Sequence, residues 1–185
     1  MRDENRVPVQ IGSFEQVVLP HLDAAYNLAR WLVRKPQDAE DIVQEAYLRA
    51  FKFFGGYQGG DARFWVLKIV RNTSYSFLEK NRTANLAEEF DETVHTAVSE
   101  QSGVEGALAQ SVDSQILRKA LDELPVNFRE VIVLRELEGM SYKEIAELMG
   151  KPIGTVMSGL ARARTQLKER LIRRRAEEGQ HGLRK

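Results

Sequence analysis

The side chains whose types and spacing best suit chemistry in this chain are hydroxyls and cations between residues 155 and 164. Thr155, Ser158 and Arg162 recur at intervals of three and four, so they share one helical face, apart from the apolar stripe of the same segment. Hydroxyl and guanidinium groups on one face of a helix can contact phosphates and base edges of a DNA duplex. The pattern predicts duplex binding, and the alternative is an ordinary helical hairpin with a solvated basic face.

A helix-turn-helix is the element that would present this face. Ser141 is followed three residues later by Glu144, a capping-box pattern that starts a short helix. Gly150 and Pro152 end that helix, because glycine is a natural C-terminal stop and proline cannot continue the hydrogen-bond ladder. A second helix then runs from about residue 154 to the arginine cluster at 173–175 and can enter a major groove. The predicted duplex-contacting residues are Lys143, Thr155, Ser158, Arg162 and Arg164.

Charge is strongly segregated along a chain that is neutral overall, with 27 basic and 27 acidic residues. Residues 141–185 hold 11 basic and 5 acidic side chains, whereas residues 87–113 hold 7 acidic and no basic ones. One part of the surface is therefore suited to polyanions, and one segment avoids or mimics them.

Several classes of function are disfavoured by composition. The chain has no cysteine and three histidines far apart in sequence, and it shows no nucleophile–base set or phosphate-binding loop. It therefore predicts no catalytic residues, no metal, no cofactor and no small-molecule substrate. The polar start and the absence of a long apolar run predict a cytoplasmic protein without membrane insertion.

The amino-terminal half predicts three helices around an aromatic loop. Apolar periodicity gives a helix over 13–34, kinked or split at Pro20, and a second helix with Asp38 as its N-cap. The loop FKFFGGYQGG at 51–60 either anchors neighbouring helices, the expectation for Phe51 and Phe54, or offers aromatic faces to unstacked bases.

A third helix over 61–86 is basic on balance and follows this loop. Trp65, Ile69 and Leu78 are predicted to be buried in it, while Arg71, Asn72, Lys80 and Arg82 remain for an anionic partner.

The carboxyl-terminal half begins with an acidic stretch that lacks periodicity and predicts a linker. Helical patterns return over 107–124 and 127–138, the latter with an apolar stripe that includes Leu137, and then comes the helix-turn-helix. The prediction is an all-α fold of two small helical domains, 11–86 and 113–176, joined by a flexible acidic linker at 87–112.

Three blocks resemble the extracytoplasmic-function (ECF) group of bacterial RNA polymerase sigma factors. They are DAEDIVQEAYLRAF at 38–51, FWVLKIVRN at 64–72 and ELPVNFREVIVLRELEGMSYKEIAELMGKPIGTV at 123–156. The resemblance covers nearly the whole chain, in the family's order and spacing. It implies a dissociable promoter-specificity subunit that binds core RNA polymerase, recognises two promoter elements and promotes DNA opening.

The resemblance also implies partners and site residues. Region two would dock on the β′ clamp helices and hold the minus-ten element as a single strand, and region four would read the minus-thirty-five duplex and contact the β flap. An anti-sigma factor is a further implied partner. The residues implied for polymerase binding are Asp38, Asp41, Gln44, Glu45 and Arg49. Those implied for the minus-ten strand are Tyr57, Arg63, Trp65, Lys68, Arg71, Asn72, Lys80 and Arg82.

The recognition helix departs from the family's pattern at two positions. The family commonly has a run like VGTVKSRLHRAR, whereas this chain has IGTVMSGLARAR, with Met157 and Gly159 in place of cations. The slope of log K for DNA binding against log salt concentration should therefore become shallower by about 0.9 for each phosphate that the helix does not reach. Met157 is expected either to touch a thymine methyl group or to be buried.

Two other functions remain open from the sequence. A sigma-like decoy would sequester an anti-sigma factor without directing transcription, and Met157 and Gly159 fit that role. A free-standing repressor or activator would use the same helix-turn-helix without polymerase.

The acidic linker is expected to suit a positively charged polymerase channel.

Overall fold

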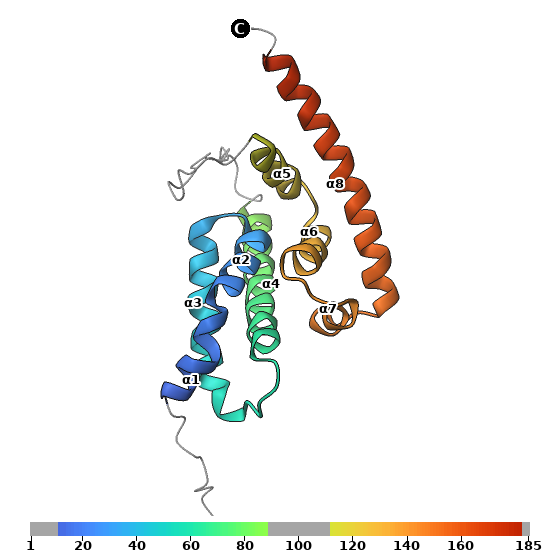
Figure 1. Ribbon diagram of the computed structural model, residues 1–185. Helices are drawn as coiled ribbons and strands as arrows, with labels where there is room; N and C mark the ends of the chain where they lie inside the picture. The colour runs from blue at the N-terminus through green and yellow to red at the C-terminus, as the bar shows by residue number, and fades with distance from the viewer. Residues whose placement is uncertain (1–10, 89–111, 183–185) are drawn as a thin grey trace, which may run out of the picture. The chain divides into compact units, whose positions relative to one another are not determined.

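The computed structural model describes residues 11–88 and 112–182, and every element in these two ranges is a helix (Figure 1). The chain divides into two compact units, residues 1–98 and 99–185, each described by itself below. The predicted all-α fold of two helical domains is confirmed. The predicted linker falls almost entirely outside the described residues.

The first unit is a bundle in which α2, α3 and α4 pack against one another (Figure 1). Its core is built from leucine, valine and alanine side chains of these three helices. The elements are α1 (Ile11–Val18), the 3-10 turn η1 (Leu19–His21), α2 (Leu22–Val33), α3 (Pro36–Phe53), the 3-10 turn η2 (Phe54–Gly56) and α4 (Ala62–Glu88). The predicted split of the first helix is confirmed, because Pro20 lies in η1 and has no amide hydrogen for an α-helical bond.

The start of α3 differs from the prediction. The helix begins at Pro36 with Lys35 as its N-cap, so Asp38 is not the cap. Proline suits the first helical position, where its missing amide hydrogen would be unpaired anyway and its fixed φ is already helical. Asp38 instead lies in the first turn, where its carboxylate faces the positive end of the helix dipole.

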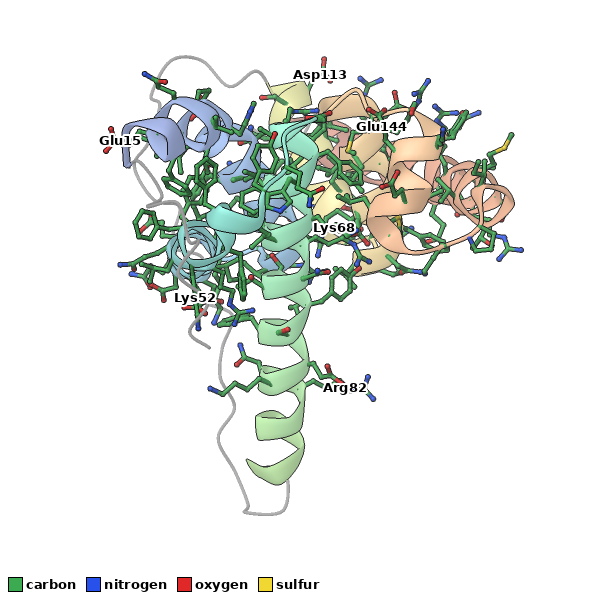
Figure 2. All side chains as sticks on the ribbon, turned by 90° about the horizontal axis from the view of Figure 1, so that it is seen from below. Glu15, Lys52, Lys68, Arg82, Asp113 and Glu144 are labelled. Carbon is green, nitrogen blue, oxygen red and sulfur yellow. The ribbon has the colours of Figure 1, made fainter. Side chains whose placement is uncertain are left out.

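The prediction that Trp65, Ile69 and Leu78 are buried is wrong, since all three are only half-buried. The core face of α4 is formed by Val66, Leu67 and Val70, each at most 1% exposed. In Figure 2 the part of α4 around Arg82 extends past the other helices of this unit, and residues 79–82 are exposed.

The second unit places a long helix, α8, against three shorter ones (Figure 1). Its elements are α5 (Val112–Asp122), α6 (Val126–Ile132), the π-helical turn η3 (Val133–Leu137), α7 (Tyr142–Met149) and α8 (Ile153–Gly182). Val156, Leu160 and Ala163 of α8 are at most 2% exposed, which confirms the predicted apolar stripe over the first part of the helix. Farther along the stripe, Leu167 and Leu171 are half-buried.

The predicted helix over 127–138 is not a continuous α-helix. From Val133 it becomes a π-helical turn, which winds the chain more loosely than an α-helix. The apolar stripe predicted from a 3.6-residue period therefore does not extend to Leu137, which is 55% exposed.

The predicted capping box of α7 is confirmed. The Glu144 amide donates to the Ser141 hydroxyl oxygen at 3.2 Å, and the Ser141 amide donates to the Glu144 carboxylate at 2.7 Å. Gly150 ends the helix with a φ of 62°, a left-handed conformation that glycine adopts without a steric penalty. These local contacts set the turn between α7 and α8.

Candidate nucleic-acid and polymerase-binding surfaces

The recognition helix presents the predicted duplex-reading side chains to the outside. Thr155, Ser158 and Arg162 are exposed on α8, and Lys143 is exposed on α7. The Ser158 hydroxyl donates to the Thr155 carbonyl oxygen at 3.1 Å, so its own oxygen can still accept a hydrogen bond. The helix-turn-helix therefore offers hydroxyl and guanidinium groups on one face.

Arg164 has a partner inside its own unit. Its Nε donates to the Glu136 carboxylate at 3.2 Å, and this bond raises the pKa of the Arg164 guanidinium above its ordinary value. Glu136 lies in η3, so the pair joins the recognition helix to the turn that follows α6. Neither local spacing nor charge pattern indicates this contact, because 28 residues separate the two side chains.

The two positions that depart from the family's pattern are accessible. Met157 is 51% exposed, so the expectation of a buried methionine is wrong. A Cβ atom built on Gly159 would have no heavy atom within 4 Å, so a larger side chain fits there.

One face of α4 combines cations with aromatic rings. Lys68, Arg71, Asn72 and Tyr75 recur at helical spacing, and the guanidinium carbon of Arg71 lies 4.6 Å from the centre of the Tyr75 ring. Lys68 Nζ lies 5.9 Å from the Phe64 ring centre. In such cation–π pairs the cation is attracted to the negative face of the ring.

The other cations predicted for the minus-ten strand are spread along α4. Arg63 is half-buried near its start, and Lys80 and Arg82 are exposed toward its other end. Figure 2 shows Lys68 and Arg82 projecting from different turns of the helix. Sequence analysis missed Phe64 and Tyr75, although an aromatic residue four positions from a cation on a helix is a readable signal.

The aromatic loop is joined to α4 by ring contacts. Tyr57 lies between Phe54, at 5.8 Å between ring centres and nearly parallel, and Trp65, at 5.1 Å. The Tyr57 hydroxyl donates to the Gly60 carbonyl oxygen at 2.8 Å, which closes the loop. The predicted residues Tyr57 and Trp65, eight positions apart, thus form one aromatic surface next to the basic face of α4.

The same loop is also anchored to α1. The Phe14 ring meets Phe51 and Phe54 edge to face, with ring centres 5.2 Å and 5.3 Å apart. Phe54 is half-buried, which agrees with an anchoring role, whereas Phe51 remains 43% exposed. The rings that contact α1, Phe51 and Phe54, are therefore different from the rings predicted to meet unstacked bases, Tyr57 and Trp65.

The outward face of α3 is polar with an apolar margin. Asp41, Gln44, Glu45 and Arg49 are exposed, and Asp38 is half-buried. Arg49 Nε donates to the Glu45 carboxylate at 2.7 Å, a pair within one helix turn. A shallow hollow beside it is lined by Glu45, Leu48, Arg49, Lys52 and Phe53.

Leu48 and Phe53 are the residues of this hollow that the sequence analysis missed. They are 61% and 60% exposed, respectively. Apolar side chains of this size at the surface, next to alternating charges, suit a protein partner. The sequence does indicate that these two side chains are exposed, because neither belongs to the apolar stripe that α3 buries.

The carboxyl-terminal half of α8 is fastened to α5 by ion pairs. The Glu123 carboxylate accepts hydrogen bonds from Arg173 and Arg174, and Arg170 Nε lies 3.9 Å from it. Farther along, Arg175 donates to Asp113 at 3.0 Å. Much of the basic charge counted in the sequence of this region therefore holds the unit together.

Comparison with known proteins assigns both units. Residues 17–84 match the family model described as Sigma-70 region 2, and residues 114–167 match Sigma-70, region 4. The ECF RNA polymerase sigma factor SigE of Mycolicibacterium smegmatis is 33% identical over 171 residues, which cover 91% of this chain. The chain belongs to the ECF group of RNA polymerase sigma factors. It spans 65% of the length of that relative.

Two further comparisons agree with this assignment. The ECF RNA polymerase sigma-E factor of Escherichia coli is 34% identical over 149 residues, covering 74% of this sigma factor and 77% of the relative. The sigma factor RpoE of Bartonella quintana, solved in complex with the anti-sigma factor NepR, is 31% identical with a TM-score of 0.71. That likeness covers 87% of this chain and 98% of the RpoE chain.

Neither a membrane span nor a metal centre is found in the described part of this ECF sigma factor. None of the helices in residues 11–88 and 112–182 is long and apolar enough to span a membrane. Within the same residues, no three histidine, aspartate or glutamate side chains form a group that could hold a metal ion.

Proposed function

We propose that this sigma factor is the dissociable promoter-specificity subunit of RNA polymerase, and that it acts in the cytoplasm without catalytic chemistry of its own. The observation that carries the proposal is the presence of two family-matched units, Sigma-70 region 2 and Sigma-70 region 4, in one chain. One face of α4 combines cations with aromatic rings, and α7 and α8 form a helix-turn-helix. Opening a promoter requires both a reader of duplex and a holder of unpaired bases.

The α4 face is proposed to hold the minus-ten strand. Unstacked bases would lie against Tyr57 and Trp65, and stacking on an aromatic ring is worth about 1–3 kcal/mol per base. Lys68 and Arg71 would balance the phosphate charge, and Asn72 can hydrogen-bond a base edge. Arg63, Lys80 and Arg82 would guide the strand electrostatically along the helix.

The helix-turn-helix is proposed to read the minus-thirty-five duplex. Thr155 and Ser158 would face base edges, while Lys143 and Arg162 would contact phosphates. Arg164 would contribute mainly by keeping α8 in place through Glu136, because its guanidinium is already hydrogen-bonded there.

The outward face of α3 is proposed to dock on the β′ clamp helices of the polymerase. Asp38, Asp41, Gln44, Glu45 and Arg49 would supply polar contacts around the rim. Leu48 and Phe53 would supply the apolar area that a polar rim needs at its centre. Region four would contact the β flap.

We further propose that an anti-sigma factor holds this protein inactive. The support is the similarity to RpoE of Bartonella quintana, which was solved with the anti-sigma factor NepR. An occupant of the α3 face would compete directly with polymerase.

Reconstitution with core RNA polymerase tests the proposal. Promoters would be selected from genomic DNA by the reconstituted holoenzyme, and a specific run-off transcript is expected from them. Permanganate footprinting should show unpaired thymines around the minus-ten element. No specific transcript from any fragment, together with tight binding of an anti-sigma factor, would favour the decoy. Duplex binding by the chain alone would favour a free-standing regulator.

Separate variants divide the proposed roles. Lys68→Ala with Asn72→Ala should reduce permanganate reactivity more than duplex binding, whereas Arg162→Gln should weaken duplex binding and reduce its salt slope by about 0.9. Leu48→Ala with Phe53→Ala should weaken assembly with core polymerase. Ile172→Ala is a matched control, since this side chain is 60% exposed and has no assigned role.

A further inference from the structure

The groove-reading end of α8 is uncharged. Residues 153–161, IGTVMSGLA, contain no ionisable side chain and neither asparagine nor glutamine. Arginine and lysine read guanine in the major groove, and asparagine and glutamine read adenine. Because the N-terminal residues of a recognition helix contact the base edges, this helix must read bases by other chemistry.

The apolar side chains at this end divide into two groups. Val156 and Leu160 are 2% and 1% exposed and belong to the core, whereas Ile153 and Met157 are 46% and 51% exposed. Ile153 and Met157 are four residues apart and therefore lie next to each other on the helix surface. They form one apolar patch beside the exposed hydroxyl residues Thr155 and Ser158.

Glycines lie three residues before and two residues after Met157 in α8. Gly154 and Gly159 have open space where a Cβ atom would be, with nothing within 4 Å. The backbone can therefore come close to a base-pair edge, with Met157 as the long side chain on this part of the surface. Its thioether is flexible and polarisable, so it can adapt to a small apolar group.

We propose that Met157, with Ile153 beside it, reads the C5 methyl group of a thymine in the minus-thirty-five duplex. This inference rests on the proposed function, because it requires α8 to occupy the major groove. The thymine methyl is the apolar group that base pairs present in that groove, so it matches an apolar patch in a way that no guanine or cytosine edge does. Specificity here comes from apolar contact in place of the missing cations.

Thymine-to-uracil exchange tests the contact, because deoxyuridine lacks only the methyl group and pairs in the same way. Each thymine of the minus-thirty-five element in a selected promoter would be replaced singly, and holoenzyme binding and open-complex formation measured. The wild type should bind about fourfold more weakly at one position, which corresponds to burial of one methyl group. Holoenzyme with Met157→Ala should bind the thymine promoter about as weakly as the wild type binds the uracil promoter. Uracil at that position should not weaken the binding of Met157→Ala any further.

Two controls separate a methyl contact from a general loss. Met157→Leu should retain the sensitivity to uracil, because leucine is also apolar, and Ile172→Ala, on the same helix about four turns away, should behave as the wild type. The salt slope of Met157→Ala should equal that of the wild type, since methionine carries no charge to pair with a phosphate.

The outcomes distinguish this inference from the proposed function. If wild-type holoenzyme initiates specifically but is indifferent to uracil at every thymine, the methyl contact does not exist and the proposed function stands. Equal sensitivity of Met157→Ala and the wild type would mean that another residue makes the contact. Absence of any specific transcript from the wild type would overturn both.

Discussion

The two units of this sigma factor differ in how far along the sequence their cations reach for a partner. In the region-two unit, Lys68 and Arg71 lie over aromatic rings, and a series of rings from Phe14 to Trp65 fastens the loop and the first helix. In the region-four unit, Arg164 and Arg174 reach acids far away in sequence. The cation–ring contacts of the first unit join residues of one helix, α4, whereas the cation–carboxylate pairs of the second unit join segments far apart in sequence and so help to hold the fold.

The comparison can be measured because both tryptophans of the chain, Trp31 and Trp65, lie in the first unit. Tryptophan emission therefore follows unfolding of the region-two unit, while far-ultraviolet circular dichroism follows helices of both units. Variants of either unit can be tested in the full chain, with the other unit as an internal control.

The largest effect is expected at the aromatic contacts of the first unit. Phe14 is 8% exposed and meets two rings, so Phe14→Ala should lower the free energy of unfolding by about 3 kcal/mol. Urea denaturation followed by tryptophan emission measures it. The part of the circular-dichroism transition due to the second unit should not move; a shift of both would show that the units unfold together.

A smaller loss is expected at the ion-pair cluster of the second unit. Glu123→Gln removes the charge that three arginines share, and the pairs are partly exposed, so the loss should be about 1–2 kcal/mol. Circular dichroism should detect it while tryptophan emission stays unchanged. Asp113→Asn is the control, because its pair with Arg175 is 72% and 66% exposed and should contribute less than about 0.5 kcal/mol.

Restoring a cation to the recognition helix should show how a charge added at its surface, in contrast to the paired arginines of this unit, affects DNA binding. Gly159→Arg fits the open space at this position and should steepen the salt dependence of promoter binding by about 0.9. Replacing a helical glycine should also stabilise the second unit by about 0.5–1 kcal/mol. Gly159→Ala separates the two effects, since it should stabilise without changing the salt slope. An unchanged slope for Gly159→Arg would mean that this position faces away from DNA.

The smallest effect concerns a polar contact within the first unit. The Tyr47 hydroxyl donates to the Val18 carbonyl oxygen at 3.3 Å, and Tyr47→Phe should cost about 0.5–1 kcal/mol. Burial, with a contribution from Asp23, raises the pKa of Tyr47 to about 12. Folding thus favours the neutral phenol, so this part of the stability is present below about pH 10 and is lost as the pH rises toward 12. Tyr47→Phe should lack that loss between pH 10 and 12, as followed by tryptophan emission.

Local features of the molecule were readable from the sequence. The capping box at Ser141 and Glu144, the stop at Gly150 and the split at Pro20 each depend on a few neighbouring residues, and each was confirmed. The all-α fold and the family likewise follow from periodicity and contiguous blocks. These signals are local because helical hydrogen bonds join residues only four positions apart.

The predictions were wrong where the position of a side chain depends on neighbouring helices or on how its own helix winds. Leu137 follows the apolar period but lies in a π-helical turn, which rotates it outward. Leu78 is apolar enough to be buried, yet it is only half-buried, and the four residues that follow it in α4 are exposed. Trp65 meets the rings of the aromatic loop, which leave it half-buried. Asp38 is a good capping residue, but Pro36 starts the helix two residues earlier.

The sequence by itself determined the helices, the turn of the recognition motif and the family of this protein. Only the tertiary structure decided which cations are engaged. Arg162 and Arg164 look equivalent in the sequence, but Arg164 is hydrogen-bonded to Glu136, 28 residues away, while Arg162 is exposed on the outer face of α8. The physical reason is that a side chain's availability to DNA depends on which distant groups folding brings within hydrogen-bonding distance, and no local pattern specifies that.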